Sequence, residues 1–276
     1  MGRGVARARC IAAAVAARFS ASDGGFQGDY RSWSAALQDA HGYATHDILE
    51  RVRTAQRKVI SGQAVFERDG VCFDAPDWNL GLLACLLRVA ASQGGSLRVL
   101  DFGGSLGSSY SQCRPFFREL REVRWSVVEQ AHFVACGRAE FESAELRFFE
   151  SIEDALRAGP VDVALLSGVL PYVQAPYAVI ASLASARIPW VLVDRNPVYS
   201  DVRDRLVVQH VPKRIYGSPA SYPAWIFARN QIQEALAAHW EVLFEAPSLD
   251  EDMRIDHRPV QFRLILAGPR REARTP

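Results

Sequence analysis

Short apolar runs alternate with longer amphipathic stretches along this chain, and the alternation is regular from residue 97 onward. Five of the runs have the length of buried strands: 97–101, 123–129, 146–149, 161–167 and 190–194. Segments with helical composition lie between them, including 131–141 and 175–186. Strands that alternate with helices predict right-handed crossovers and a mainly parallel sheet covered on both faces.

The C-terminal part of the chain breaks this pattern. Residues 240–246 and 261–267 are two further strand-like runs, and the segment between them is too short for a full helix and its connections. Two strands joined in this way predict an antiparallel hairpin at the edge of the sheet. The expected fold class is therefore α/β, a doubly wound, mainly parallel, seven-stranded sheet with a C-terminal antiparallel hairpin.

The first part of the chain lacks the strand–helix alternation. A glycine-rich loop and a short helix capped by Ser32 are expected within 23–40, and a second helix over 45–61. Residues 66–74 have the pattern of a turn or short strand pair, and the Leu- and Ala-rich 78–92 that of a buried helix. We therefore divide the chain into an N-terminal helical extension and lid, 1–94, and a Rossmann-like domain, 95–276.

An insertion interrupts the alternation after the fifth predicted strand. Residues 196–239 are rich in aromatic residues and proline and end in a predicted helix at about 229–239. This segment follows a strand whose carboxyl end faces the edge where open α/β sheets bind ligands. The insertion is therefore a candidate for substrate binding.

Composition restricts the function classes. The 276 residues are 49% hydrophobic, which is enough for a substantial core, and the net charge of +1 gives no electrostatic argument for a nucleic-acid partner. The apolar runs are too short to span a bilayer. Five scattered cysteines without a C-x-x-C pair predict neither a metal site nor a disulfide framework, and favour reduced thiols in the cytoplasm. The Arg- and Ala-rich residues 1–19 fit either an amphipathic helix or a signal peptide.

The run Leu97–Gly107 carries the clearest chemical signal. An apolar strand leads into Asp101, and a turn containing Gly103, Gly104 and Gly107 follows. Such a turn lets backbone N–H groups approach a nucleotide-like ligand closely, and a carboxylate at the strand end can accept hydrogen bonds from it.

This turn resembles the glycine-rich motif of class I S-adenosylmethionine-dependent methyltransferases, usually D/E-x-G-x-G-x-G. Glu129, at the end of the second strand, matches the acid that holds the ribose hydroxyls in that fold, and the terminal hairpin is also typical of it. The resemblance covers about 95–268. Ser105 replaces the middle glycine, and we expect its φ to be negative and its side chain to point away from the ligand.

A second resemblance spans nearly the whole chain. The matching segments are Phe26–Trp33, Glu67–Asp69, Asp101–Ser109, Val128–Phe133 and Ser221–Trp225. They are similar to a little-characterised bacterial family of methyltransferases whose members tend to be associated with surface-polysaccharide gene clusters. This resemblance implies the fold more than a particular substrate.

The class I resemblance implies a set of cofactor-binding residues for S-adenosylmethionine. They comprise the turn, the acids and small residues at the strand ends, and two lid aromatics: Tyr30, Trp33, Asp101, Gly103, Gly104, Ser105, Gly107, Glu129, Gln130, Ser151, Ile152, Ser167, Gly168 and Val169. Within this set, Ser151 and Ile152 take the adenine-contact position, and Tyr30 and Trp33 cover the cofactor and exclude water.

Methyl transfer to a hydroxyl benefits from a base, whereas transfer to a carboxylate needs none. The candidates for the catalytic group are His210 in the insertion, Asp194 at the end of strand five and Tyr172 after strand four. The candidate substrate-binding residues are Arg68, Arg195, Tyr222 and Trp225. No metal site is expected.

The leading hypothesis is a cytoplasmic methyltransferase that acts on a small polar acceptor such as a sugar or nucleotide-sugar. Its partners are then small molecules, with no nucleic acid and no stable membrane insertion, and a homodimer is left open. The alternatives are a nicotinamide-dependent oxidoreductase, which the glycine spacing and the hairpin disfavour, and a non-catalytic relative that only binds the cofactor.

Overall fold

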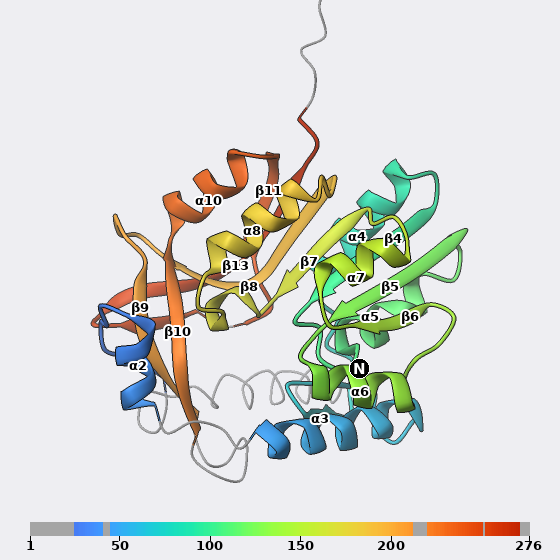
Figure 1. The fold of residues 1–276 in the computed structure, drawn as a ribbon, viewed down its shortest axis with the longest axis horizontal. Helices are drawn as coiled ribbons and strands as arrows, with labels where there is room; N and C mark the ends of the chain where they lie inside the picture. Colours follow the sequence, from blue (N-terminus) through green and yellow to red (C-terminus); the bar gives the residue numbers. More distant parts are fainter. Residues whose placement is uncertain (1–24, 41–44, 212–219, 251, 271–276) are drawn as a thin grey trace, which may run out of the picture.

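Five neighbouring strands of the large sheet run parallel to one another and can be followed in Figure 1. The computed structural model describes residues 25–40, 45–211, 220–250 and 252–270, with the backbone alone at 45–47. The strands are β4 (Ser96–Phe102), β5 (Glu122–Val128), β6 (Leu146–Phe149), β7 (Val163–Ser167) and β8 (Trp190–Tyr199). They lie in the order β6-β5-β4-β7-β8, and each neighbouring pair is parallel. The predicted parallel core is confirmed.

The two C-terminal strands, β11 (Glu241–Pro247) and β13 (Arg258–Gly268), pair in antiparallel register. The strand β13 also pairs antiparallel with β8, so it lies between β8 and β11. A short strand, β12 (Met253–Ile255), precedes it and pairs with its first residues. The predicted hairpin is therefore present, and its second strand is the one inserted next to the parallel sheet.

The sheet extends beyond the seven predicted strands. Within the insertion, β9 (Arg205–Val211) and β10 (Ala220–Ala228) pair antiparallel, and β1 (Gly25–Gln27) adds an edge strand to β9. Strand β8 continues to Tyr199 instead of ending at 194, and its last residues pair in parallel with β10. From the sequence we interpreted this aromatic and proline-rich segment as an insertion without strands. Its β-branched and aromatic residues, which favour strands, outweigh its prolines.

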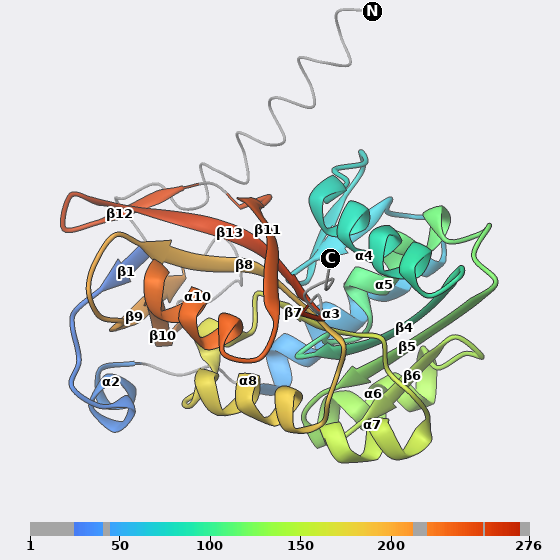
Figure 2. The same ribbon diagram turned by 90° about the horizontal axis from the view of Figure 1, so that it is seen from above.

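Helices cover both faces of the sheet (Figure 2). On one face lie α4 (Leu80–Ser92), α5 (Ser108–Cys113) and α6 (Ala131–Glu140), which share a hydrophobic cluster with alternate residues of β4, β5 and β7. On the other face lie α7 (Ile152–Ala158), α8 (Pro176–Ser185) and α10 (Arg229–Ala237), which pack on the intervening residues. The fold is a doubly wound α/β sheet, as predicted.

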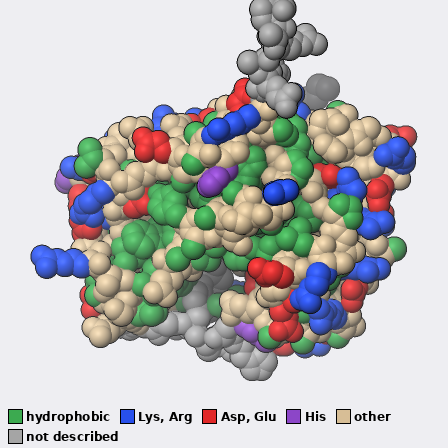
Figure 3. Space-filling view, turned by 45° about the horizontal axis from the view of Figure 1, so that its top comes forward, with side chains coloured by type: hydrophobic (Ala, Val, Ile, Leu, Met, Phe, Trp, Pro, Cys, Tyr) green, Lys and Arg blue, Asp and Glu red, His purple; other side chains and the backbone are tan. Residues whose placement is uncertain are grey.

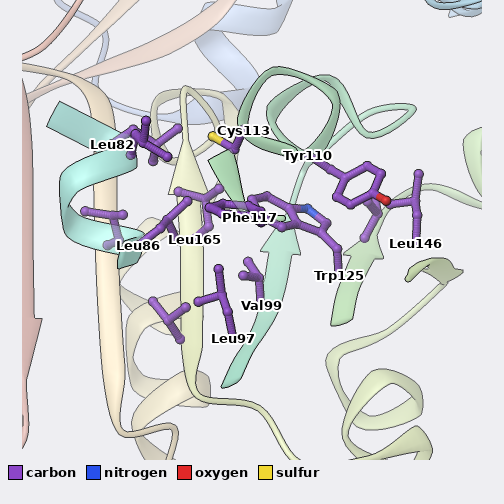
Figure 4. Close-up of a cluster of buried hydrophobic side chains, with 14 of the residues drawn as sticks. Leu82, Leu86, Leu97, Val99, Tyr110, Cys113, Phe117, Trp125, Leu146 and Leu165 are labelled. Atoms are coloured by element: carbon purple, nitrogen blue, oxygen red, sulfur yellow. The ribbon is translucent and has the colours of Figure 1, made fainter. Parts of the chain in front are cut away.

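An aromatic group centred on Trp125 fills the core beneath the carboxyl end of β4 (Figure 4). The Trp125 side chain is fully buried, and its ring lies 5.8 Å from that of Tyr110 and 6.4 Å from that of Phe117. Its indole Nε1 donates a hydrogen bond of 2.9 Å to Asp101. The core therefore holds the strand-end carboxyl group directly.

The N-terminal elements pack on two separate parts of this sheet. Helix α2 (Trp33–Asp39), whose N-cap is Ser32 as predicted, covers β9 and β10. Helix α3 (Thr45–Ile60) and the hairpin of β2 (Phe66–Arg68) and β3 (Val71–Phe73) lie over the edge formed by the carboxyl ends of the parallel strands. The Arg- and Ala-rich start of the chain lies outside the described residues. The division at residues 94 and 95 stays a prediction, although α4 shares the core of the sheet.

The surface is mixed in charge. Acidic and basic side chains are interspersed on the face drawn in Figure 3, in keeping with the near-zero net charge. Within the part of the chain that the structure describes, no helix has both the length and the apolar character needed to cross a bilayer. The same described residues contain no group of three or more His, Cys, Asp or Glu side chains placed to hold a metal ion.

Candidate active site

A cavity of about 620 Å³ lies at the carboxyl ends of the parallel strands. Its floor consists of residues that directly follow β4, β5 and β7, among them Gly103, Glu129 and Gly168. The chain order reverses at β4, which lies between β5 and β7, and open α/β sheets bind ligands in the crevice beside such a strand. The volume lies within the range of about 300–1,000 Å³ that is typical of ligand pockets.

The glycine turn after β4 approaches this cavity as backbone. Gly103 has φ of 73°, and a Cβ there would overlap the side chain of Val169 from the loop after β7. A Cβ on Gly104 would lie 2.5 Å from the carboxyl carbon of Asp101. Both positions therefore require glycine, and the turn packs tightly against its neighbours on two sides.

Ser105 differs from the sequence-based expectation. Its φ is 55°, in the left-handed region, whereas we expected a negative value. Its backbone N–H donates a hydrogen bond of 3.3 Å to Oε1 of Glu129. The turn keeps the conformation that a glycine would favour, because this bond and the close packing of its neighbours hold the serine backbone in place.

Glu129 is fixed by backbone donors from two segments. Besides Ser105, the N–H of Gln130 donates to its Oε2 at 2.8 Å, so each carboxylate oxygen has one bond and keeps lone-pair capacity for a ligand. Burial raises the pKa of Glu129 above its usual value, against the lowering effect of these two hydrogen bonds. Glu129 and Gln130, which we predicted to bind the cofactor, both line the cavity.

Asp101 lies deeper than the other acids of the floor. It is only 1% exposed, and the turn at Gly104 packs directly on its carboxyl group. Burial raises its pKa to about 7, partly opposed by the hydrogen bond from Trp125. Asp101 therefore links the glycine turn to the core, because it contacts both.

The roof of the cavity is the β2–β3 hairpin. Glu67 is 2% exposed, and its carboxylate accepts hydrogen bonds from the Ser108 hydroxyl and, at 3.0 Å, from the N–H of Gly70. Burial raises the pKa of Glu67 to about 8. We had singled out Arg68 as a substrate-binding residue, and it also lines the cavity, but its guanidinium pairs with Asp77 at 3.4 Å.

Arg195 connects the roof to the sheet. Its guanidinium pairs with Asp69 of the hairpin turn at 2.8 Å and with Asp250 at 2.7 Å, and Arg195 and Asp69 have φ of 55° and 53°. Such left-handed non-glycine backbones are often found at functional sites. Arg195 lines the cavity as predicted, with both of its ion pairs made to the protein's own carboxylates.

Asp194 does not line the cavity, although we predicted it as a catalytic residue. It is 1% exposed and accepts hydrogen bonds from Asn79 at 2.9 Å, Ser167 at 3.0 Å and Ser248 at 3.2 Å. Asn79 and Ser167 do line the cavity, and Asp194 holds their side chains in place. The expectation of a catalytic role is wrong in geometry, and we assign Asp194 a positioning role.

Two tyrosines form one wall of the cavity. Tyr172, in the 3₁₀ helix η3 (Leu170–Tyr172), and Tyr222 on β10 meet edge to face with ring centroids 5.2 Å apart. The Tyr172 hydroxyl donates to Gln209 at 2.9 Å. Both tyrosines were predicted site residues, Tyr172 as a catalytic and Tyr222 as a substrate-binding residue.

His210 lies outside the cavity lining, so the structure does not support it as the base. It follows Gln209 on β9, and successive side chains of a strand point to opposite faces. Gln209 faces Tyr172 at the cavity wall, which places His210 on the face that α2 covers. We had interpreted the insertion as a loop, in which side chains do not alternate between two faces. Because β9 is a strand, its alternation places His210 away from the cavity.

The lid aromatics are also placed elsewhere. Trp33 stacks on Trp225 with centroids 6.3 Å apart, and Tyr30 donates to Asp39 at 2.8 Å, within the cluster beneath α2. Trp225 donates to the carbonyl of Val173 at 3.2 Å and so supports the cavity wall from behind. None of Tyr30, Trp33 and Trp225 is part of the cavity lining in the described structure, because β1 and α2 pack on the added strands.

Three further cofactor candidates are structural. Gly107 begins α5 with φ of 87°, and a Cβ there would lie 2.9 Å from Leu146. Ser151 is the N-cap of α7, and Ile152 belongs to the core. The residue that lines the cavity at this strand end is Glu150, one position earlier. Ser167, Gly168 and Val169 line the cavity as predicted.

Sequence reasoning missed part of the site. Glu67, Ser108 and Gln112 line the cavity, and Gln112 also donates to the Glu67 carbonyl at 3.1 Å. The sequence offered little signal for Glu67, since the strand Phe66–Arg68 carries two charged residues among its three. The apolar Ile48 and Val52 of α3 complete the roof.

Comparison with known proteins gives structural similarity only. No family model matches the chain, and no curated protein matches it. Similar solved structures include the N-terminal domain of EvdMO1 in the presence of SAH and D-fucose, with 15% identity over 83% of this chain and 99% of that one, at a TM-score of 0.47. Magnesium protoporphyrin IX methyltransferase from Synechocystis PCC 6803 with bound SAM has 11% identity over 87% and 99%, at 0.45.

A third similar structure is 1,6-didemethyltoxoflavin-N1-methyltransferase from Burkholderia thailandensis, with 18% identity over 82% of this chain and 91% of that one, at a TM-score of 0.39. Because these TM-scores are all below 0.5, we take the function from the cavity itself.

Proposed function

We propose that this protein is an S-adenosylmethionine-dependent methyltransferase that acts on a small polar acceptor. The observation that carries the proposal is the contact between the glycine turn and Glu129 at the strand where the chain order reverses. A backbone turn and a ribose-binding carboxylate that face one cavity suit a nucleoside with an amino-acid tail.

The residues present fit this cofactor. At Gly103 and Gly104 a side chain would overlap the neighbouring residues, so the turn presents bare backbone to the cavity. Glu129 holds the ribose hydroxyls through its remaining lone pairs. Gln130, Phe133 and Glu150 line the adjoining end of the cavity, where the adenine would lie.

When bound, the cofactor supplies a methyl group on a positively charged sulfur. The protein orients the acceptor in line with that methyl group and excludes water from the cavity. Tyr172 and Tyr222 provide aromatic surface, and Arg68 and Arg195 provide polar contacts, at the end of the cavity away from Glu129. This combination suits a sugar or nucleotide-sugar hydroxyl, because aromatic faces pack against sugar rings. The family resemblance supports a cytoplasmic role in surface-polysaccharide synthesis.

The proposal is tested by isothermal titration with S-adenosylmethionine, S-adenosylhomocysteine and NAD. We expect both sulfur compounds to bind to the purified protein and Glu129→Ala to abolish their binding. Glu119→Gln, at an exposed position outside the cavity, is the control and retains it. Binding of NAD alone would favour the oxidoreductase alternative, and cofactor binding without turnover on any acceptor would favour the non-catalytic one.

A further inference from the structure

The acids of the cavity differ in what they can reach. Glu129 is held by two backbone N–H groups at the nucleoside end, and Asp101 is covered by the turn at Gly104. Asp69 is paired with Arg195. Glu150 lies at the end where the adenine would bind. Glu67 remains, on the roof between these groups, and the hydroxyl of the cavity-lining Ser108 donates directly to it.

Ser108 connects Glu67 to the open part of the cavity. Its hydroxyl donates to Oε1 of Glu67, and Ser108 is partly exposed where Glu67 is buried. Ser108 directly follows the glycine turn that would hold the methyl donor. On the far side, Glu67 interacts with the charges of Asp69, Arg68 and Arg195, which belong to the acceptor end. The pair therefore lies between the two ends of the cavity.

We propose that Glu67 and Ser108 form a proton relay in which Glu67 is the final acceptor of the proton lost by a hydroxyl substrate. This inference rests on the proposed methyltransferase function and assigns its acceptor to the hydroxyl class, because a carboxylate acceptor would need no base.

The step balances in atoms and charge. The acceptor oxygen forms a bond to the methyl carbon while the carbon–sulfur bond breaks and its electron pair stays on the sulfur. The acceptor proton passes to Oγ of Ser108 as the Ser108 proton passes to Oε1 of Glu67. The products are the methyl ether, the neutral thioether and a protonated Glu67, which then loses its proton to solvent.

The surroundings of Glu67 determine how it titrates. Desolvation is the main cause that raises its pKa to about 8, the charge of Asp69 adds to the rise, and the Gly70 N–H, Arg195 and Arg68 oppose it. The titratable Cys72 on β3 interacts with Glu67, and Arg51 of α3 packs beside Gly70. A positive sulfur near this carboxyl group favours its ionised form.

The test is the ratio of the affinities for S-adenosylmethionine and S-adenosylhomocysteine, measured by titration calorimetry from about pH 6 to about pH 9. The two ligands differ in the charge on sulfur, which also shifts the pKa of the ligand's own α-amino group. That contribution is the same for the wild type and for Glu67→Gln, so the difference between their two curves reports Glu67. Relative to Glu67→Gln, we expect the wild-type ratio to rise as the pH increases toward about 8 and to level off above it, by about tenfold for each unit by which the sulfonium lowers the pKa of Glu67.

The variants identify the group. Glu67→Gln lacks the part of the rise in the affinity ratio that Glu67 causes. In Ser108→Ala that part of the rise moves to higher pH, because the ionised carboxylate loses the hydroxyl as a hydrogen-bond donor. Glu119→Gln is the matched control and keeps the wild-type curve. Identical curves for the wild type and Glu67→Gln overturn the relay. If neither ligand binds to the wild-type protein, the proposed function itself fails, which is a distinguishable result.

Discussion

At the β4–β5 end of the cavity the contacts join two short stretches of chain, whereas at the β8 end they join segments far apart in sequence. Ser105 contacts Glu129 across 24 residues and the next strand. Arg195 contacts Asp69 across 126 residues and Asp250 across 55. The contacts at the β4–β5 end are made by backbone groups and one acid. Those at the β8 end are made by charged side chains from three separate segments of the chain.

The two ends of the cavity are held in different ways. The nucleoside end depends on the backbone conformation of the glycine turn. A substitution there is tolerated only if the new side chain has room and its residue can adopt the φ of that position. The acceptor end depends on ion pairs between partly buried side chains, so its tolerance is set by charge balance. Four changes test this contrast.

The largest expected effect is on stability, at the acceptor end. Arg195→Met leaves Asp69 and Asp250 without their shared cation. The Asp250 side chain is 15% exposed and that of Asp69 is 53% exposed, so we expect a cost of about 3 kcal/mol, at the lower end of the range of about 3–5 kcal/mol for a buried ion pair. Urea denaturation measures this loss. Arg203→Met is the control, because Arg203 pairs with Asp29 at the surface and its loss should cost about 1 kcal/mol or less. Equal losses in the two variants would contradict the contrast.

At the nucleoside end, Gly103→Ala should abolish cofactor binding. The new Cβ overlaps Val169 and the backbone has φ of 73°, so the turn must move, and we expect the affinity for S-adenosylhomocysteine to fall at least about 100-fold, or about 2.7 kcal/mol. Gly62→Ala is a matched control, since Gly62 has the same φ with open space around it. Calorimetry should show unchanged binding in Gly62→Ala. If Gly62→Ala lost a comparable affinity, the loss in Gly103→Ala would not be due to the overlap with Val169.

The pH dependence of stability sharpens the role of the roof. Because the pKa of Glu67 is raised to about 8 in the folded protein, the native state retains a proton that the unfolded chain has lost above about pH 4.5. Its contribution to stability therefore falls as the pH rises from about 5 toward 8. Relative to Glu67→Gln, we expect the wild type to lose about 2 kcal/mol between about pH 5 and about pH 7 in denaturant titrations. Parallel pH curves for the two proteins would argue against this titration.

The smallest effect concerns Ser105. Its left-handed backbone costs a non-glycine residue about 1–2 kcal/mol, so Ser105→Gly should raise the free energy of unfolding by about 1 kcal/mol, less the added chain entropy. Binding of S-adenosylhomocysteine should be kept, since the donor to Glu129 is a backbone N–H. Thermal denaturation and calorimetry measure the two quantities, and weaker binding in the variant would show that the serine side chain has a direct role.

The parallel strands and the hairpin followed from the sequence because each element has a local pattern, whereas the order of the strands in the sheet came from the structure. A local pattern also predicted the turn at Gly103 and Gly104 and Glu129 at the next strand end. The predicted end of β6 was less accurate. We expected Ser151 and Ile152 to contact the adenine, but Ser151 is the N-cap of α7, Ile152 is a core residue, and Glu150, one position earlier, lines the cavity. Such a shift is small in sequence but reverses the face of the strand or loop.

The acceptor end could not be predicted in the same way. His210 appeared as a loop residue, and only the pairing of β9 with β1 and β10 shows on which face it lies. Trp33 and Trp225 stack on each other through the packing of α2 on that sheet. Glu67 and Asp194 are both buried carboxyl groups that accept a hydrogen bond from a cavity-lining serine, and only the folded structure shows that Glu67 itself lines the cavity and Asp194 does not.

By itself the sequence determined the α/β class, the glycine turn and the acid opposite it, because apolar periodicity and backbone requirements are properties of short segments. The tertiary structure alone decided which side chains meet at the roof and the acceptor end. Those contacts depend on strand pairing, on the desolvation of Glu67 and Asp101, and on ion pairs across more than a hundred residues, and none of these is encoded in a local pattern.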